Sequence, residues 1–164
     1  TLEEIKDFKV KNFYFNLYKN YDGQENKGQF LFTPPVQTMY ALDKAFEEYE
    51  EEGEQGRFER YSSLYQQMYD AMIGLGFKCL IDASLNSKIL TSFIEPTHDH
   101  YDFEKMHDYL YSKGVTIYPG KNAKEDTFRI SNLGQLTSTD IDYFIKLMKD
   151  YLSESGIDKI YSLH

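Results

Sequence analysis

Residues 127–134 read TFRISNLG, which predicts a short β-strand with one arginine between two apolar residues. Side chains alternate between the faces of a strand, so Phe128 and Ile130 are expected to face a core and Arg129 the opposite side. A guanidinium presents a rigid fork of donors that matches carboxylate or phosphonate oxygens. The partner of Arg129 is therefore either a ligand anion or a neighbouring Asp or Glu, and both alternatives are open at this point.

Outward from this strand, hydrophobic periodicity and turn signals predict a small domain of mixed elements. Strands are expected over 77–81, 88–95 and 115–118, and helices over 34–53, 57–75, 102–113 and 137–152. The helices separate strands that are joined by short loops. This order predicts the α+β class, with a small, mostly antiparallel sheet covered by helices.

Two helix starts have clear capping signals. Asp102 is expected to cap the helix that follows it, and Thr137 with Asp140 three residues later forms a strong start for the last helix. Residues 57–75 carry apolar side chains at steps of three and four, which places them on one side of a helix. That side fits core packing better than a partner-helix seam, because it spans fewer than three heptads.

The segment before the first long helix reads FTPP, residues 32–35. Thr33 is placed as an N-cap and Pro34 as the first helical residue. Free amides and the helix dipole favour an anion at such a position, with the Thr33 hydroxyl as the main contact because prolines lack amides. The alternative is that Thr33 only caps its own helix.

The first thirty residues give weaker signals. Phe13, Phe15 and Leu17 alternate with polar residues and predict an extended segment, and residues 21–28 predict a loop. The sequence does not begin with Met, which predicts a processed or excised segment.

Composition excludes several classes of partner. The 164 residues carry a formal net charge of −9 without a long basic run, which argues against nucleic-acid and anionic-membrane surfaces. No apolar run is long enough to cross a membrane, and Cys79 is the single cysteine, so a cytoplasmic location is predicted. His98 and His100 flank Asp99 without a completing ligand pattern, so no metal site is predicted.

Four stretches occur in an order known from one protein family. They are FTPPV (32–36), SKILTSF (87–93), GVTIYPG (114–120), and FRI with NLG (128–130 and 132–134). From about Lys6 to Leu152, the chain resembles the C-terminal part of 2-aminoethylphosphonate:pyruvate aminotransferases. These are fold type I pyridoxal-phosphate enzymes related to alanine:glyoxylate aminotransferase.

The resemblance implies a dimeric enzyme that uses pyridoxal 5'-phosphate and moves the amino group of 2-aminoethylphosphonate to pyruvate. It assigns Arg129 to the substrate phosphonate or carboxylate, and Thr33 to the cofactor phosphate of the neighbouring subunit. It also implies that residues 1–32 connect to a large domain outside this sequence and that residues 33–164 form a small C-terminal domain. The Schiff-base lysine and the aspartate on the pyridine nitrogen belong to the large domain. No catalytic residue is therefore assigned in this chain, and the chain alone is expected to be inactive.

One departure and two alternatives accompany the resemblance. Ser131 stands where the family more often has glycine. A related enzyme acting on alanine or serine with glyoxylate or pyruvate is one alternative, because phosphonate and carboxylate both suit a bidentate arginine. The other is a free-standing α+β binding or oligomerisation module without chemistry. Without its large domain, the chain is expected to expose apolar surface around Phe13, Phe15, Leu17 and Phe32.

Overall fold

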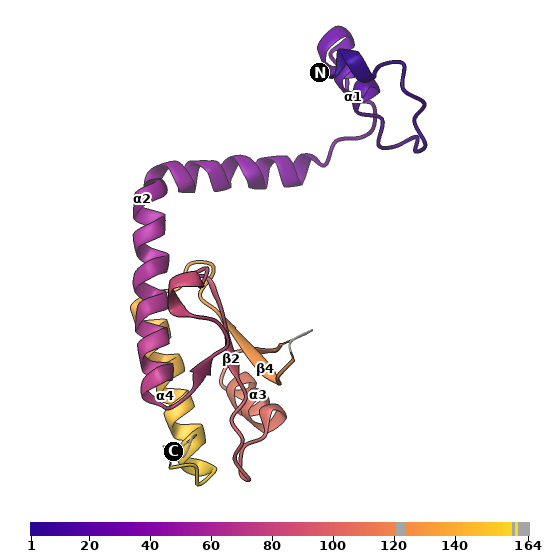
Figure 1. Ribbon diagram of the computed structural model, residues 1–164. Coiled ribbons are helices and arrows are strands. Elements are labelled where there is room, and N and C mark those ends of the chain that lie inside the picture. The colour runs from indigo at the N-terminus through magenta and orange to yellow at the C-terminus, as the bar shows by residue number, and fades with distance from the viewer. Residues whose placement is uncertain (121–123, 159, 161–164) are drawn as a thin grey trace. The chain divides into compact units, whose positions relative to one another are not determined.

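The computed structural model describes residues 1–120, 124–158 and 160 (Figure 1). These residues form two compact units, Thr1–Glu51 and Glu52–His164. The predicted division after residue 32 concerns the domains of a longer protein, and it stays a prediction. No helix among the described residues combines the length and apolar character needed to cross a membrane.

The unit Thr1–Glu51 contains the 3₁₀-helix η1 (Glu3–Ile5), the helix α1 (Leu17–Lys27) and the beginning of α2 (Val36–Gly74). The predicted loop over 21–28 is therefore wrong, and no strand forms at 13–17. Asn16 caps α1 by accepting the Lys19 amide at 2.9 Å, and Gly28 ends α1 in the left-handed conformation with φ 60°. These local caps outweigh the alternating pattern before them.

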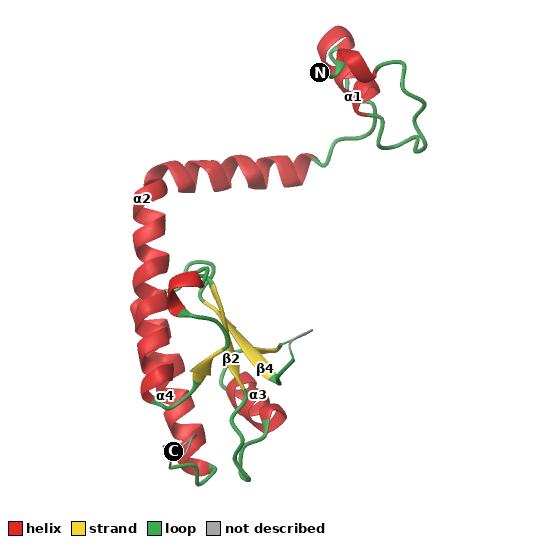
Figure 2. Cartoon of the chain, in the orientation of Figure 1, coloured by secondary structure: helices red, strands yellow, loops and turns green. Residues whose placement is uncertain are grey.

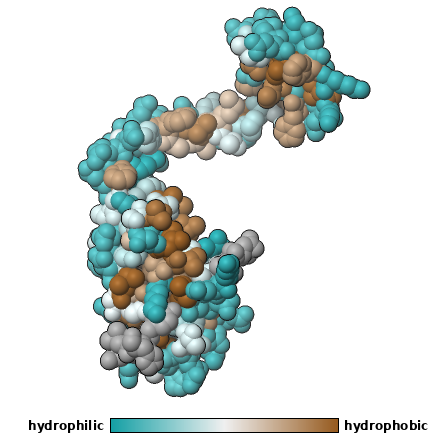
Figure 3. All heavy atoms as spheres, viewed as in Figure 1, coloured by the Kyte–Doolittle hydropathy of each residue, from teal (hydrophilic) through white to brown (hydrophobic). Residues whose placement is uncertain are grey.

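Apolar side chains gather on the surface of this first unit (Figure 3). Phe13, Phe15 and Leu17 are 75%, 72% and 63% exposed, as expected. Phe32 is half-buried, with its ring stacked 4.7 Å from that of Tyr14.

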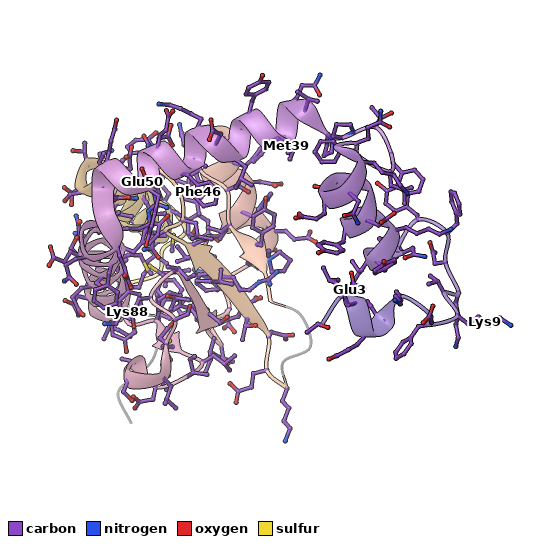
Figure 4. The ribbon with its side chains drawn as sticks, turned by 90° about the horizontal axis from the view of Figure 1, so that it is seen from above. Glu3, Lys9, Met39, Phe46, Glu50 and Lys88 are labelled. Atoms are coloured by element: carbon purple, nitrogen blue, oxygen red, sulfur yellow. The ribbon has the colours of Figure 1, made fainter. Side chains whose placement is uncertain are left out.

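The helix α2 is interrupted once. Gly53 has φ 73° and ψ 160°, values outside the helical region that favour glycine. The interruption agrees with the prediction of two helices, of which the first ends at residue 53 and the second begins at residue 57. In the stretch before it, Met39 and Phe46 lie seven residues apart on one side of the helix and are 47% and 56% exposed (Figure 4).

The unit Glu52–His164 holds a four-stranded antiparallel sheet in the order β1-β2-β4-β3 (Figure 2). Its strands are β1 (Lys78–Cys79), β2 (Leu90–Ile94), β3 (Tyr118–Pro119) and β4 (Thr127–Ser131), and a 3₁₀-helix η2 (Ala83–Leu85) lies between β1 and β2. The longest pairing, between β2 and β4, runs from Leu90 opposite Ser131 to Ile94 opposite Thr127. The predicted α+β fold with an antiparallel sheet is confirmed.

The helices α3 (Phe103–Ser112) and α4 (Ser138–Glu154) begin where their caps predicted. The Asp102 carboxylate accepts the Lys105 amide at 3.0 Å. Thr137 and Asp140 form a reciprocal capping box, in which Asp140 accepts the Thr137 amide at 2.7 Å.

One face of the sheet forms the core with these helices. Phe128 is fully buried, and its ring lies 5.4 Å from Phe77, 5.8 Å from Phe93 and 6.3 Å from Phe103. The second half of α2 contributes the buried Leu64, Tyr65, Met68 and Met72, which confirms core packing for this helix. The core therefore lies on the Phe128 side of the sheet, and Arg129 belongs to the other side.

A charged cluster lies at the start of the second unit. The Glu52 carboxylate accepts hydrogen bonds from Arg57 and Arg60, and Arg60 also donates to the carbonyl of Gly134 at 2.8 Å. These hydrogen bonds, first from Arg60 and then from Arg57, lower the pKa of Glu52 to about 2. The cluster therefore connects α2 to the segment that follows β4.

The depressed pKa predicts a pH dependence of stability. The stabilisation from the Glu52 carboxylate is complete above its unfolded pKa and is lost as the pH falls from about 4.5 towards about 2. The difference in free energy of unfolding between the wild type and Glu52→Gln should therefore be largest near neutral pH and shrink in acid. Urea titrations at about pH 7, 4 and 3 measure it. A difference that stays constant over this range would contradict the assignment.

Candidate functional site

Arg129 lies in the middle of β4, with a strand on each side. It is paired with Ser92 on β2 and with Tyr118 on β3. Its neighbours Phe128 and Ile130 are 0% and 7% exposed on the core side. The predicted alternation is confirmed, and Arg129 projects from the opposite face of the sheet.

The guanidinium of Arg129 has no hydrogen-bond or ion-pair partner among the described residues. The side chain is half-buried, and its Nε is fully buried without a hydrogen-bond partner in the described part of the chain. The ion pairs among the described residues involve Arg57 and Arg60 but not Arg129. Among the described residues no carboxylate pairs with Arg129, so the contacts give no support to the alternative of a protein partner and leave an external anion as the open one.

The backbone that follows β4 is fixed by a residue whose role the sequence did not reveal. Asn132 is fully buried, and its side-chain amide donates to the carbonyls of Tyr61 and Lys88, both at 3.1 Å. Its backbone amide donates to Ile89 at 3.2 Å. Asn132 therefore joins β4 to α2 and to the start of β2, and a polar residue directly after a buried strand is the signal that indicates such a role.

Lys88 is held in an unusual conformation at the same junction. Its φ of 62° places a residue other than glycine in the left-handed region, and its carbonyl accepts the Asn132 bond. The Lys88 ammonium lies 5.3 Å from the Phe58 ring centroid. Figure 4 shows Lys88 among the side chains of this unit. The end of the β2–β4 pair at Leu90 and Ser131 is thus fixed, two residues along β4 from Arg129.

Thr33 lies in the other unit, in the segment before α2. The predicted cap is wrong in detail, because α2 begins at Val36 and not at Pro34. The Val36 amide donates to Pro34 at 2.9 Å and the Met39 amide to Pro35 at 3.0 Å. Thr33 is exposed, and its hydroxyl makes no hydrogen bond within the described residues. Two consecutive prolines delay the helix, since the residue before a proline is disfavoured in the helical region.

Thr33 and Arg129 belong to the units Thr1–Glu51 and Glu52–His164, respectively, and each is described within its own unit. His98 and His100 are engaged locally: the His100 amide donates to Nδ1 of His98 at 3.1 Å, and Nδ1 of His100 lies 3.2 Å from the Ser155 carbonyl oxygen. Among the described residues, no group of three or more His, Cys, Asp or Glu is placed to hold a metal ion.

The chain is similar to curated proteins named 2-aminoethylphosphonate–pyruvate transaminase. It is 38% identical to that of Bacillus cereus (strain ATCC 10987 / NRS 248) over 79% of this chain and 36% of the relative. It is 36% identical to that of Vibrio parahaemolyticus over 88% of this chain and 40% of the relative. No family model matches the chain.

Solved structures share the fold at low sequence identity. A ureidoglycine–glyoxylate aminotransferase from Bacillus subtilis matches 91% of this chain with a TM-score of 0.74 and 20% identity, and 39% of that structure is covered. An alanine–glyoxylate aminotransferase from Nostoc matches 91% of this chain with a TM-score of 0.77 and 17% identity, and 40% of that structure is covered.

These similarities confirm the resemblance inferred from the four sequence stretches. The chain spans about two fifths of the length of the curated relatives, at 36% and 40% for the two named above. It is therefore a relative of the 2-aminoethylphosphonate–pyruvate transaminases, and it has the fold of the corresponding part of an aminotransferase.

Proposed function

We propose that this chain is the substrate-anion-binding part of a transaminase that moves the amino group of 2-aminoethylphosphonate to pyruvate, giving phosphonoacetaldehyde and alanine. The names of its relatives support this reaction. The observation that carries it is the half-buried Arg129 in the middle of the sheet, which forms no ion pair with a carboxylate of the described residues. A phosphonate accepts two parallel bonds from such a fork.

Arg129 binds and orients the substrate in this proposal. Its position between two paired strands keeps the base of the side chain fixed, so the fork holds the phosphonate end while the amino end extends towards the reacting centre. The local positive charge also offsets the repulsion of a chain with net charge −9 for an anionic substrate.

The proposal includes pyridoxal 5'-phosphate, which supplies an electron sink when bound. The donor set around Thr33 fits a phosphate group. Its exposed hydroxyl makes no bond within the described residues, and the amides of Gln37 and Thr38 in the first turn of α2 have no backbone partner there. We assign Thr33 to the cofactor phosphate of a neighbouring subunit, and this assignment requires a homodimer of the whole protein.

A second function within the same fold has one observation in its favour. The two structural neighbours named above are glyoxylate aminotransferases, and an arginine fork binds a carboxylate as well as a phosphonate. The alternative is a transaminase acting on alanine or serine. A module that binds an anion without chemistry would use an unpaired Arg129 in the same way, and the names of the relatives favour the transaminase over it. We further propose a cytoplasmic location, which agrees with the free thiol of Cys79.

Amino-donor assays on the whole protein test the function. With pyruvate as acceptor, 2-aminoethylphosphonate is expected to give a higher kcat/KM than alanine or serine with glyoxylate. Indifference to 2-aminoethylphosphonate would contradict the proposal. The 164-residue chain alone serves as the control: mixed with cofactor, it should neither transaminate nor give an absorption band that borohydride fixes to a lysine.

A further inference from the structure

The pairing of three strands places Tyr118, Arg129 and Ser92 side by side across the sheet. Tyr118 on β3 and Ser92 on β2 are both directly opposite Arg129 on β4. Directly opposite residues of an antiparallel pair project from the same face, with Cβ atoms about 4.5–5.5 Å apart. These three side chains therefore form one row on the face opposite Phe128.

Tyr118 has a side chain long enough, and a hydroxyl free enough, to donate a second hydrogen bond to an anion at Arg129. Its side chain is 60% exposed, and no hydrogen bond of its hydroxyl occurs among the described residues. A tyrosine hydroxyl and a guanidinium stand at similar heights above a sheet, because the two side chains have similar lengths. Ser92 has a short, half-buried side chain, so it does not fill the space beside the Arg129 guanidinium on the β2 side.

A phosphonate and a carboxylate differ in the number of oxygens that need partners. The arginine fork donates one bond to each of two oxygens, which engages both oxygens of a carboxylate but leaves the third oxygen of a phosphonate without a donor. A tyrosine hydroxyl is a suitable donor for that third oxygen. A site with such a donor discriminates against a carboxylate, because a carboxylate has no third oxygen and leaves the tyrosine hydroxyl without a ligand partner.

We infer that Tyr118 is a specificity-determining residue, whose hydroxyl donates to the third phosphonate oxygen and makes the Arg129 site prefer phosphonates over carboxylates. The inference deepens the proposed function and rests on its assignment of Arg129 to the substrate anion. It assigns no step of the chemistry to Tyr118.

The test compares anion binding in the whole protein and in the variant Tyr118→Phe. Dissociation constants for methylphosphonate and for acetate, measured by calorimetry, are independent of transaminase activity. Loss of one hydrogen bond to a charged group is expected to weaken methylphosphonate binding about 10-fold and to change acetate binding less than about 2-fold. In activity assays, the same variant should lose about 10-fold in kcat/KM for 2-aminoethylphosphonate but not for 3-aminopropanoate, its carboxylate counterpart.

Tyr111→Phe is the matched control, because Tyr111 lies on α3 and is 66% exposed. Tyr111→Phe should change neither the dissociation constant for methylphosphonate nor that for acetate. Unchanged methylphosphonate binding in Tyr118→Phe, an equal loss for both anions, or a wild type that does not bind methylphosphonate would each overturn the inference. A wild type that prefers methylphosphonate through Tyr118 but does not transaminate 2-aminoethylphosphonate would refute the proposed reaction and support the selectivity.

Discussion

Replacing Arg129 by lysine in the whole protein is expected to lower kcat/KM for 2-aminoethylphosphonate by about 5- to 150-fold, which corresponds to about 1–3 kcal/mol. Lysine keeps the positive charge but cannot make two parallel bonds to one anion. Arg129→Ala is expected to have a larger effect, because it removes the charge as well. The long aliphatic part of lysine also fills much of the space that arginine occupies, so the fold should persist.

Steady-state kinetics of the purified variants measure this effect. Lys105→Ala is a suitable control for Arg129→Ala, because it removes one positive charge from the exposed side of α3, where the Lys105 side chain is 78% exposed. Unchanged kinetics in Arg129→Lys would return Arg129 to a structural or solvated role, and the proposed site would then be wrong.

Replacing Phe128 by alanine is expected to reduce the free energy of unfolding by about 3–5 kcal/mol. Phe128 is fully buried among Phe77, Phe93 and Phe103, so its loss removes apolar burial and leaves a cavity between the sheet and α3. Adjacent residues of β4 thus have separate tasks in the proposed function, with Phe128 for stability and Arg129 for the ligand.

Urea denaturation of the wild type and Phe128→Ala measures the loss. Leu85→Ala provides the comparison, since Leu85 is 77% exposed and its replacement should change the free energy by no more than about 0.5 kcal/mol. An effect of Phe128→Ala as small as that of Leu85→Ala would mean that the core described around β4 is wrong.

The features that could be predicted from the sequence are local ones. The alternation of Phe128, Arg129 and Ile130 showed which side chains share a face, and the caps Asp102 and Thr137 marked two helix starts. Each depends on residues within a few positions of one another, where side-chain chemistry acts directly on the backbone.

The errors arose where local signals compete. The alternation of Phe13, Phe15 and Leu17 suggested an extended segment, but the Asn16 cap starts a helix at Leu17 and Gly28 ends it. Thr33 followed by Pro34 predicts a helix that begins at Pro34. The second proline delays the start of α2 to Val36. In both places, a stronger backbone constraint determined the result.

The surroundings of the candidate site could not be predicted, because they depend on non-local pairing. Nothing near Arg129 in the sequence indicates that Ser92 and Tyr118 flank it. The bonds of Asn132 to Tyr61 and Lys88 likewise connect segments 71 and 44 residues apart. Register is set by the whole buried face and not by any single strand.

The strand order has a consequence for synthesis on the ribosome. β4 lies between β2 and β3, although both of those strands are translated before it. Until Ser131 has left the ribosome, β2 and β3 each keep an unpaired edge, and such edges favour aggregation of nascent chains. A nascent chain therefore completes its four-stranded sheet and places Arg129 between Ser92 and Tyr118 at the same moment, when the last strand inserts.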